Sequence, residues 1–559
     1  MRLVVEDRSR WVLPELLRER ARELGDKPFL SFACNEATAS YAEIDERSDR
    51  MAAGLAAIGV TRGDRVMVMM GNRLEFVITW FALNKLGAFH APINTDYRGD
   101  FLEHLINTAQ AEIMVLEERF VDTLVACGEN IGRLRELIVV PDEPGSEPSV
   151  TTGRWPSRPI ASVPLAEAPP EVAVTPADTY AVLFTSGTTG RSKGALVPYA
   201  HGHLLNERNL ELLDMDGASS YISELPLFHI NAHMTVYGCM IVGAHARIEE
   251  RFSASRWLDR LRASGATHSS MLGVMVDFVL RQPPTDHDTD HNLRSVWMVP
   301  CLPELSRRFR DRFGVQRIVT SYGTTEVGMV ARRVVDRSDD ISSGPIDTDF
   351  YDVRIVDGDD EPVPDGEVGE ITVRTVLPWT VAHGYFGMPE RTVEAYRNLW
   401  FHTGDAGRFD ERGNLVFVDR LADRIRRRGE NVASADVEHV LGTHEAVVEA
   451  AVVAVDADEE GGEDEIKACL VLADGMGIDH ESFWEWCDAR LPYFAVPRYL
   501  EIYDALPKTP TEKVLKHELR VTRPDAVVAD RGPSGRPART NSVGPAATRR
   551  RRHLDPGTS

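Results

Sequence analysis

A glycine-rich segment directly after an apolar strand is the first candidate for chemistry. The predicted strand Ala181–Phe184 runs into Thr185-Ser186-Gly187-Thr188-Thr189-Gly190-Arg191-Ser192-Lys193-Gly194. Glycine lets the backbone turn tightly and bring its N–H groups toward an anion, and hydroxyl groups and a lysine add further donors. This composition suits the binding of a polyphosphate.

Two other loop types have similar sequences but fit less well. A Walker A loop needs a second glycine directly before the lysine, and Ser192 stands there. The segment Gly190–Gly194 matches the G-x-S-x-G pattern of a hydrolase nucleophile elbow, which requires the strand to end at the serine and a helix to follow. Here the strand ends near Phe184, and Val197-Pro198 follows where the helix would run. We therefore favour the phosphate loop.

Four further segments, together with this loop, resemble the motifs of the adenylate-forming superfamily, which includes acyl-CoA synthetases, luciferases and nonribosomal-peptide adenylation domains. They are Leu225–Ala232, Tyr322–Glu326, Trp400–Asp405 and Pro507–Lys513. All five motifs follow the family's order, and the resemblance covers most of the chain. It implies that ATP and a carboxylic acid form an acyl-adenylate, whose acyl group then passes to a thiol.

The resemblance also implies roles for individual residues. Thr325 is expected to touch the α-phosphate, Glu326 to help hold Mg²⁺, and Lys513 to stabilise the charge that develops during adenylation. The expected ATP-binding residues are Thr185, Ser186, Gly187, Thr188, Thr189, Gly190, Lys193, Tyr322, Thr324, Asp405 and Arg420, with Asp405 and Arg420 on the ribose. The expected acyl-pocket residues are His229, Asn231, Val299, Pro300 and Gly323. Ala422 is the expected hinge, and Gly429 and Glu430 are expected to serve the thioester step.

The C-terminal part resembles the crotonobetaine/carnitine–CoA ligase branch most. The segments that carry this resemblance are Arg428–Val432, Glu465–Ala468 and Phe494–Glu501. It implies an AMP-forming acyl-CoA ligase that uses ATP, Mg²⁺ and coenzyme A. One alternative is a stand-alone adenylation enzyme that loads a carrier protein. Another is a non-catalytic nucleotide-binding relative, which the retained Lys193, Glu326, Asp405 and Lys513 disfavour.

The chain departs from the family pattern at several positions. Many members have Gly-Gly-Ala-Pro beside the adenine and acyl sites, where this chain has Trp297-Met298-Val299-Pro300-Cys301. We expect the acyl wall to be narrowed or reshaped there. Asp419 replaces the usual glycine before the ribose-binding arginine, Ala422 replaces the usual hinge residue, and Glu512 replaces the glycine before the catalytic lysine. These changes affect geometry and hinge behaviour rather than the reaction class.

Helix-like and strand-like patterns alternate in the part of the chain that must position these motifs. The predicted strands and helices up to residue 117 are Arg65–Met70, Leu74–Lys85, His90–Ile93, Asp100–Ala109 and Ala111–Leu116. Such alternation predicts a layered α/β domain with parallel strands. Short strands at Tyr351–Asp357, Gly369–Thr375 and Leu415–Asp419 predict a smaller β subdomain, and residues 141–176 are interpreted as a surface excursion.

A second module follows Arg420. Its predicted elements are a helix at Ala435–Leu441, strands at Val447–Val455 and Ile466–Leu472, and a helix at His480–Ala489. The fold class is therefore α/β, with a large N-terminal domain of layered α/β subdomains plus a β subdomain (residues 1–419) and a small mobile C-terminal α+β domain (residues 420–521). The residues from 522 to 559 are rich in Arg, Pro and Gly and are expected to form a disordered tail.

Composition limits the cellular setting and the partners. The 559 residues carry a formal net charge of -24, which argues against a general nucleic-acid binder. Six cysteines without a C-x-x-C pair indicate reduced, buried thiols, and the N-terminus has no apolar signal-peptide core. The apolar stretches are too short to span a bilayer. We therefore expect a cytoplasmic enzyme that acts on a small carboxylic acid, with a carrier protein as a possible partner.

Overall fold

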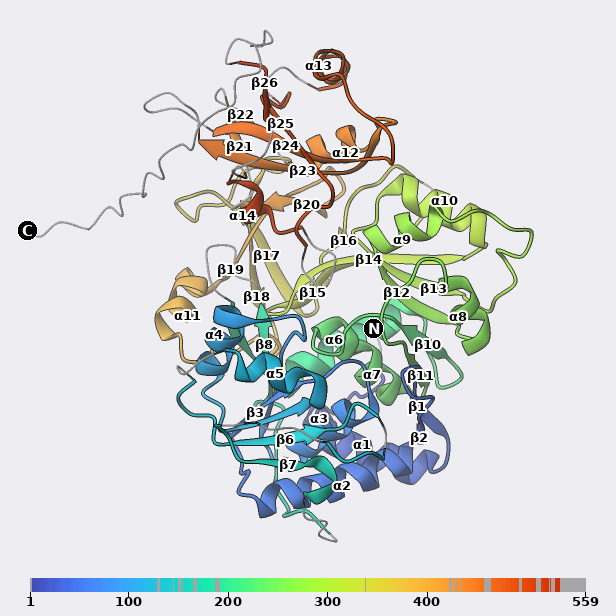
Figure 1. Cartoon of the computed structure of the whole chain (residues 1–559), viewed down its shortest axis with the longest axis vertical. Coiled ribbons are helices and arrows are strands. Elements are labelled where there is room, and N and C mark those ends of the chain that lie inside the picture. Colours follow the sequence, from blue (N-terminus) through green and yellow to red (C-terminus); the bar gives the residue numbers. More distant parts are fainter. Residues whose placement is uncertain are drawn as a thin grey trace, which may run out of the picture. The chain divides into compact units, whose positions relative to one another are not determined.

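The fold is described from a computed structural model (Figure 1). It describes residues 3–127, 131–143, 145–148, 152, 154–163, 168–185, 192–336, 338–421, 425–427, 430–432, 434–456, 464–491, 495–508, 514–521, 523 and 528–532. These residues separate into two compact units, divided between Phe417 and Val418. That division lies two residues before the boundary expected from the sequence.

A seven-stranded sheet forms the first layer of the N-terminal unit. Its neighbouring strands are parallel except for β8 and β9, which form an antiparallel hairpin. In spatial order the strands are β7 (Ser157–Pro159), β6 (Glu136–Val140), β5 (Ile113–Glu117), β3 (Arg65–Met69), β4 (Phe89–Pro92), β8 (Thr179–Thr185) and β9 (Lys193–Pro198). The parallel arrangement predicted from the βα alternation is confirmed.

An eight-stranded sheet forms the second layer. Its order is β15-β14-β13-β12-β10-β11-β1-β2, with antiparallel pairs at both edges and parallel pairs between them. The strands are β1 (Pro28–Phe32), β2 (Thr38–Ser40), β10 (Ser220–Ser223), β11 (His245–Ile248), β12 (His268–Leu272), β13 (Ser295–Val299), β14 (Arg317–Thr324) and β15 (Gly328–Val335).

Both sheets are covered by helices, and central strands such as β3 are apolar on both faces. Val66 and Val68 of β3 pack in the core that the two sheets share, whereas Met67 and Met69 pack in a core on the opposite face. Side chains of a strand alternate between its faces, so a strand buried on both sides is apolar throughout. The shared core contains residues of α1 (Leu13–Leu24), α2 (Tyr41–Ala57), α3 (Leu74–Lys85), α6 (Tyr199–Leu213) and α7 (Ile230–Val242).

The outer faces have helices of their own. The outer core of the seven-stranded sheet includes α4 (Gly99–Ala109) and α5 (Val121–Val125). The outer core of the eight-stranded sheet includes α8 (Trp257–Ser264), α9 (Gly273–Leu280) and α10 (Pro303–Phe313). Figure 1 shows α8, α9 and α10 together beside β12 and β13. Short 3₁₀ turns occur at Arg8–Arg10, Glu118–Phe120, Ile160–Ser162 and Arg397–Leu399.

A five-stranded sheet completes the N-terminal unit. Its order is β16-β20-β19-β18-β17, and the strands are β16 (Gly344–Pro345), β17 (Tyr351–Val356), β18 (Gly369–Thr375), β19 (Phe401–Phe409) and β20 (Asn414–Arg420), the last of which runs into the second unit. The helix α11 (Pro389–Ala395) lies between β18 and β19 in the sequence. This is the β subdomain that the short, turn-bounded strands predicted.

The C-terminal unit is an α+β module. Its sheet has the order β23-β24-β25-β26, and its helices are α12 (Ser434–Leu441), α13 (His480–Asp488) and α14 (Lys516–Leu519). The strands are β23 (Val447–Asp456), β24 (Asp464–Leu472), β25 (Tyr499–Tyr503) and β26 (Val528–Asp530), and β21 (Ile425–Arg427) pairs with β22 (Glu430–Val432). One face of the sheet packs on α12 and α13.

Two sequence expectations need correction. The tail was expected to begin at residue 522, but β26 pairs with β25, buries Ala529, and places Asp530 2.9 Å from Arg498. The strand could not be predicted from the composition of this stretch, because only its central residue is both apolar and buried.

The cysteines were expected to be buried, and five are, but Cys34 is exposed. None of the six forms a disulfide in the described structure.

Candidate functional site

The glycine-rich loop is carried by the β8–β9 hairpin. Thr185 pairs with Lys193 in the hairpin register, so the loop leaves and re-enters the sheet at these two residues. Ser186, Gly187, Thr188, Thr189 and Gly190 lie outside the described residues. The strand therefore continues beyond the predicted end at Phe184, and this geometry differs from a nucleophile elbow, since an antiparallel strand rather than a helix follows the loop.

The carboxylate of Glu326 lies next to the end of β8. Its Oε1 accepts hydrogen bonds from Thr185 Oγ1 and from the hydroxyl of Tyr385, both at 3.1 Å. The Nζ atom of Lys193 lies 4.8 Å from the centre of the Tyr385 ring. Three residues predicted from two separate motifs, Thr185 and Lys193 from the phosphate loop and Glu326 from Tyr322–Glu326, are thus brought together. Tyr385, which joins them, was missed in the sequence.

The segment around Tyr385 runs alongside β9 and connects it to Glu326. The amide of Phe386 donates to Gly194 O at 2.8 Å, and Leu196 exchanges two hydrogen bonds of 2.9 Å with the backbone of His383 and Gly384. The amide of Ala382 donates to Glu326 O at 2.7 Å. The glycine-flanked Tyr385-Phe386 pair before Pro389 was the available sequence signal for this segment.

The motif Tyr322–Glu326 spans the end of the β14–β15 hairpin. Thr324 pairs with Gly328, which leaves Thr325, Glu326 and Val327 in the turn. A Cβ atom at Gly323 would lie 1.9 Å from Gly328 O, so the close approach of the two strands requires glycine there. The turn therefore presents Thr325 and Glu326 at the end of a tight hairpin.

A buried histidine, also missed in the sequence, supports this turn. The Nε2 atom of His201 lies 2.9 Å from Thr325 O, and its Nδ1 atom lies 2.8 Å from Thr380 O. Burial lowers the pKa of His201. His201 thus links the turn that carries Thr325 to the start of the Tyr385 segment.

The expected ribose residue Asp405 lies in β19 and is only 2% exposed. Its Oδ2 accepts a 2.8 Å hydrogen bond from the hydroxyl of Tyr322, so two residues from different motifs meet. Arg420 belongs to the C-terminal unit, where the neighbouring Asp419 accepts hydrogen bonds from the Ser434 amide (2.8 Å) and hydroxyl (2.6 Å). Asp419, a departure from the family pattern, therefore anchors the start of α12.

The expected acyl-pocket residues lie near the carboxyl ends of neighbouring strands and at the start of α7. Val299 pairs with Leu272, and His229 directly precedes α7. Burial lowers the pKa of His229 to about 4, so its ring is neutral near pH 7. Asn231 Oδ1 accepts a 3.3 Å hydrogen bond from Ser270 Oγ. Pro300 is exposed, as is Gly323.

The half-buried Trp297 occupies the position where many members have glycine. Its indole Nε1 donates a 2.9 Å hydrogen bond to Ser321 Oγ, which fixes the ring against β14. A fixed indole takes up far more space than a glycine. The narrowing of the acyl wall at this position stays a prediction.

The expected residues of the later steps lie mostly outside the described part of the chain. They are Lys513, Ala422 and Gly429, and of Glu430 only the backbone, in β22, is described. Ala422 follows β20, the strand within which the two compact units divide.

Comparison with protein-family models matches each of the two units to a model. The model described as AMP-binding enzyme matches residues 17–386, and the model described as AMP-binding enzyme C-terminal domain matches residues 436–513. The chain belongs to the AMP-binding enzyme family. The resemblance on which the sequence predictions rested is therefore confirmed.

Individual members of the AMP-binding enzyme family are similar over most of their length. The crotonobetaine/carnitine–CoA ligase of Salmonella agona is 30% identical over 519 residues, which cover 91% of this chain and 98% of that protein. The corresponding enzyme of Shigella dysenteriae is 31% identical over 491 residues, or 86% and 93% of the two chains. ATP-bound MatB from Rhodopseudomonas palustris superposes with a TM-score of 0.79 at 25% identity, over 91% and 98%.

A further solved structure supports the fold alone. The o-succinylbenzoate CoA synthetase MenE of Bacillus subtilis, in complex with its acyl-adenylate intermediate, superposes with a TM-score of 0.77 at 23% identity, over 91% of this chain and 98% of that one.

In the described part of this chain, none of the helices has the length and apolar character needed to cross a bilayer.

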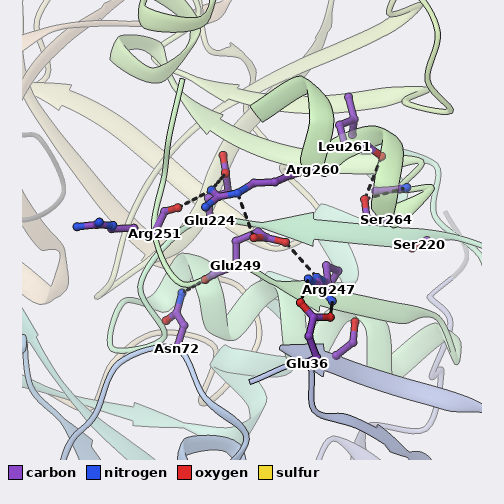
Figure 2. Close-up of polar contacts among 12 residues, drawn as sticks. Glu36, Asn72, Ser220, Glu224, Arg247, Glu249, Arg251, Arg260, Leu261 and Ser264 are labelled. Atoms are coloured by element: carbon purple, nitrogen blue, oxygen red, sulfur yellow. Dashed lines mark hydrogen bonds and ion pairs between the residues drawn. The ribbon is translucent and has the colours of Figure 1, made fainter. Parts of the chain in front are cut away.

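The Leu225–Ala232 motif of this AMP-binding enzyme is held by Asn72, another residue that was missed in the sequence. The Asn72 side chain donates to Leu225 O (3.0 Å) and to Glu249 O (2.8 Å), and it accepts from the Leu227 amide (2.8 Å). Asn72 follows β3 of the seven-stranded sheet, whereas its partners follow β10 and β11 of the other sheet. One buried amide therefore ties the segment before His229 to both sheets. Figure 2 shows its hydrogen bond to Glu249.

A buried charge network lies beside Asn72. Glu224 Oε1 lies 2.6 Å from Arg260 Nη1, and Arg260 Nε lies 3.2 Å from Glu249 Oε2. Figure 2 shows that the network continues from Glu249 through Arg247 to Glu36. Burial raises the pKa of Glu224 to about 7, and the Arg260 guanidinium opposes this rise. Two carboxylates thus share one guanidinium, and one of them, Glu224, directly precedes the motif.

This raised pKa predicts a pH-dependent stability. Because the folded state binds the Glu224 proton more tightly than the unfolded chain, the stabilisation is fully present below about pH 4.5 and is lost as the pH rises through about 7. Glu224→Gln should therefore match the wild type near pH 5 and exceed its unfolding free energy by about 2–3 kcal/mol at pH 8. Thermal melts of both proteins across this range provide the measurement.

The exposed Glu36, at the other end of the network, supplies the control. Glu36→Gln should leave the pH dependence of the wild type intact, because its side chain is 77% exposed. A stability difference between Glu224→Gln and the wild type that does not change with pH would contradict the prediction.

Proposed function

We propose that this protein is an AMP-forming acyl-CoA ligase, which converts a carboxylate, ATP and CoA to acyl-CoA, AMP and pyrophosphate. The observation that carries the proposal is the convergence of Thr185, Lys193 and Glu326 at the end of the phosphate-loop hairpin. A cation, a hydroxyl donor and a carboxylate beside a glycine-rich loop suit a metal-bound polyphosphate. Membership of the AMP-binding enzyme family and the CoA-ligase names of the relatives support the same reaction.

In the first half-reaction, a carboxylate oxygen of the acid attacks the α-phosphorus of ATP. The bond from this phosphorus to the bridging oxygen breaks, and pyrophosphate leaves. We assign binding of the β- and γ-phosphates to Thr185–Lys193 and contact with the α-phosphate to Thr325, whose position at the hairpin end suits this role. Mg²⁺, when bound to Glu326, neutralises phosphate charge.

The remaining nucleotide contacts are assigned from the family motifs, and the Tyr322–Asp405 hydrogen bond supports one of them. We assign ribose recognition to Asp405, whose orientation is set by the Tyr322 hydroxyl, and to Arg420, and we assign a supporting nucleotide contact to Thr324. A carboxylate that accepts hydrogen bonds from two sugar hydroxyls is well suited to ribose. Lys513 is assigned to the carboxylate and α-phosphate oxygens, where its charge stabilises the transition state.

In the second half-reaction, the thiol sulfur attacks the acyl carbonyl carbon, the bond to the phosphate oxygen breaks, and AMP leaves. We assign Gly429 and Glu430 to this step. We assign Ala422 to a hinge that lets the C-terminal domain rotate between the two half-reactions. The CoA-ligase names of the relatives favour CoA over a carrier-protein thiol as the acceptor. Competition between CoA and purified carrier proteins for the adenylate tests this choice.

The acyl group is proposed to lie among His229, Asn231, Val299, Pro300 and Gly323, with Trp297 forming part of the wall. The relatives named crotonobetaine/carnitine–CoA ligase make carnitine-like acids one class to include in a substrate panel, beside fatty and aryl acids. The six cysteines, none of which forms a disulfide in the described structure, support a cytoplasmic location, because disulfides are rare in that compartment.

The overall reaction predicts a defined nucleotide product. The purified protein, supplied with Mg²⁺, ATP, CoA and an accepted acid, should release AMP and pyrophosphate in equal amounts, because attack occurs at the α-phosphate. Chromatography of the nucleotides and an enzyme-coupled pyrophosphate assay measure both. Reactions without acid serve as the control, and stoichiometric formation of ADP would refute the assignment.

A further inference from the structure

The two hydrogen bonds to Glu326 converge on one oxygen of its carboxylate. Thr185 Oγ1 and the Tyr385 hydroxyl both donate to Oε1, at 3.1 Å. Glu326 itself is 8% exposed. A carboxylate with one oxygen held by two donors has a fixed plane, and its second oxygen, Oε2, then points in a fixed direction. Within the described part of the chain, both of these donors bond to Oε1 and none bonds to Oε2.

The same tyrosine also contacts the lysine of the phosphate loop. Lys193 Nζ lies 4.8 Å from the centre of the Tyr385 ring, within the range of a cation–π interaction. The ring therefore restrains the ammonium group, while the hydroxyl at its far end restrains the carboxylate. One side chain links the cation and the anion of the candidate nucleotide site without pairing them directly.

Tyr385 is itself held firmly by its backbone. Its amide donates a 2.9 Å hydrogen bond to Thr392 Oγ1, and the next residue, Phe386, donates to Gly194 O at 2.8 Å. Gly384 has a φ of +123° and a Cβ there would lie 2.3 Å from Thr392 Cγ2, so only glycine fits before Tyr385. The whole residue is 8% exposed. These contacts leave the tyrosine little freedom to reorient.

We propose that Tyr385 is a positioning residue for nucleotide and metal binding, an inference that rests on the proposed function. Through Oε1 it orients Glu326 so that Oε2 faces the metal of the metal–ATP complex. Through its ring it holds Lys193 toward the phosphates. The hydroxyl and the ring thus have separate roles, and these roles can be removed one at a time.

Direct binding measurements test this division of roles. Mn²⁺ binding in the presence of ATP is followed by electron paramagnetic resonance, and metal-free ATP binding is followed by calorimetry in EDTA, both without acid or CoA. Tyr385→Phe keeps the ring and loses the hydroxyl. It should raise the apparent Kd of Mn²⁺ on the order of tenfold, as expected for the loss of a hydrogen bond to a charged group, with metal-free ATP affinity unchanged.

Tyr385→Leu removes the ring as well and should also weaken metal-free ATP binding several-fold, through the loss of the cation–π contact with Lys193. Tyr396→Phe is the matched control, since the Tyr396 hydroxyl bonds to Ala382 O in the same segment and not to Glu326. It should leave both affinities unchanged. Circular dichroism establishes that each variant is folded, and the conservative Tyr385→Phe keeps the test valid if Tyr385→Leu is unstable.

The possible outcomes separate the inference from the function on which it rests. A Tyr385→Phe variant that binds Mn²⁺ within twofold of the wild type, while the wild type binds metal and ATP normally, overturns the role of Tyr385 alone. Equal weakening of metal-dependent and metal-free ATP binding by Tyr385→Phe overturns the division between hydroxyl and ring. A wild-type protein that binds neither ATP nor Mn²⁺ with ATP overturns the proposed function itself.

Discussion

Lys513→Ala should reduce pyrophosphate release from acid and ATP by on the order of 10²–10³-fold, while the variant still converts a supplied acyl-adenylate and CoA to thioester. During adenylation, negative charge builds on the α-phosphate and the bridging oxygen, and a fixed ammonium group there is worth several kcal/mol. The second half-reaction starts from an anhydride that already exists, so the same charge contributes little. Both half-reactions are measured separately, with purified adenylate for the second.

The neighbouring lysines provide the control for Lys513. Lys508 Nζ lies 2.9 Å from Glu449 Oε1, and Lys516 Nζ lies 2.8 Å from Glu438 Oε1, all within the C-terminal unit. Both lysines thus have a local ion-pair partner. Lys508→Ala should keep adenylation close to the wild-type rate. If folded Lys513→Ala also adenylates at that rate, Lys513 is a surface lysine and the assignment is wrong.

Ala422→Pro should affect the other half-reaction from Lys513→Ala. Adenylation should be retained, and thioester formation should be lowered on the order of 10²-fold. The compact units divide between Phe417 and Val418, within β20, and Ala422 follows this strand. Proline fixes φ near −65° and restricts the preceding Leu421, so rotation of the C-terminal unit about this point would be blocked. A misplacement of about 1 Å at a reacting centre costs about 10²-fold in rate.

A proline placed elsewhere in a nearby turn separates the hinge effect from a general effect of proline. The exposed Glu411 lies in a turn closed by a 2.9 Å hydrogen bond from the Gly413 amide to Asp410 O, at a position where proline is favoured. Glu411→Pro should leave both half-reactions unchanged. Equal loss of both steps in Ala422→Pro, or loss of neither, argues against a pivot at this residue.

Periodicity predicted the elements well because it reflects local packing. The helix predicted at Leu74–Lys85 and the strand predicted at Gly369–Thr375 have the same bounds in the structure. In such segments the spacing of apolar residues decides which side chains face a core, and neighbouring residues suffice to predict the element. The strand β26 was missed because its stability depends on pairing with β25 rather than on its own composition.

The sequence also identified most candidate chemical groups, because glycine, lysine and carboxylate residues cluster in short motifs. It could not identify Asn72, His201 or Tyr385, which act through single side chains outside these motifs. Their partners are distant in the chain, and of the three only Tyr385 has a local signal, the glycines that flank the Tyr385-Phe386 pair. The role of Asp419 at the start of α12 was obscured for the same reason, since its partner Ser434 belongs to a later element.

The sequence by itself determined the reaction class and the residue types available for it, through five motifs in a fixed order. Only the tertiary structure decided which of these groups meet. Thr185 and Glu326 are 141 residues apart, and Tyr322 and Asp405 are 83 residues apart, yet each pair is within hydrogen-bond distance. Strand order and hairpin register place them there, and burial then sets properties such as the raised pKa of Glu224. These effects depend on neighbours that only the folded chain brings together.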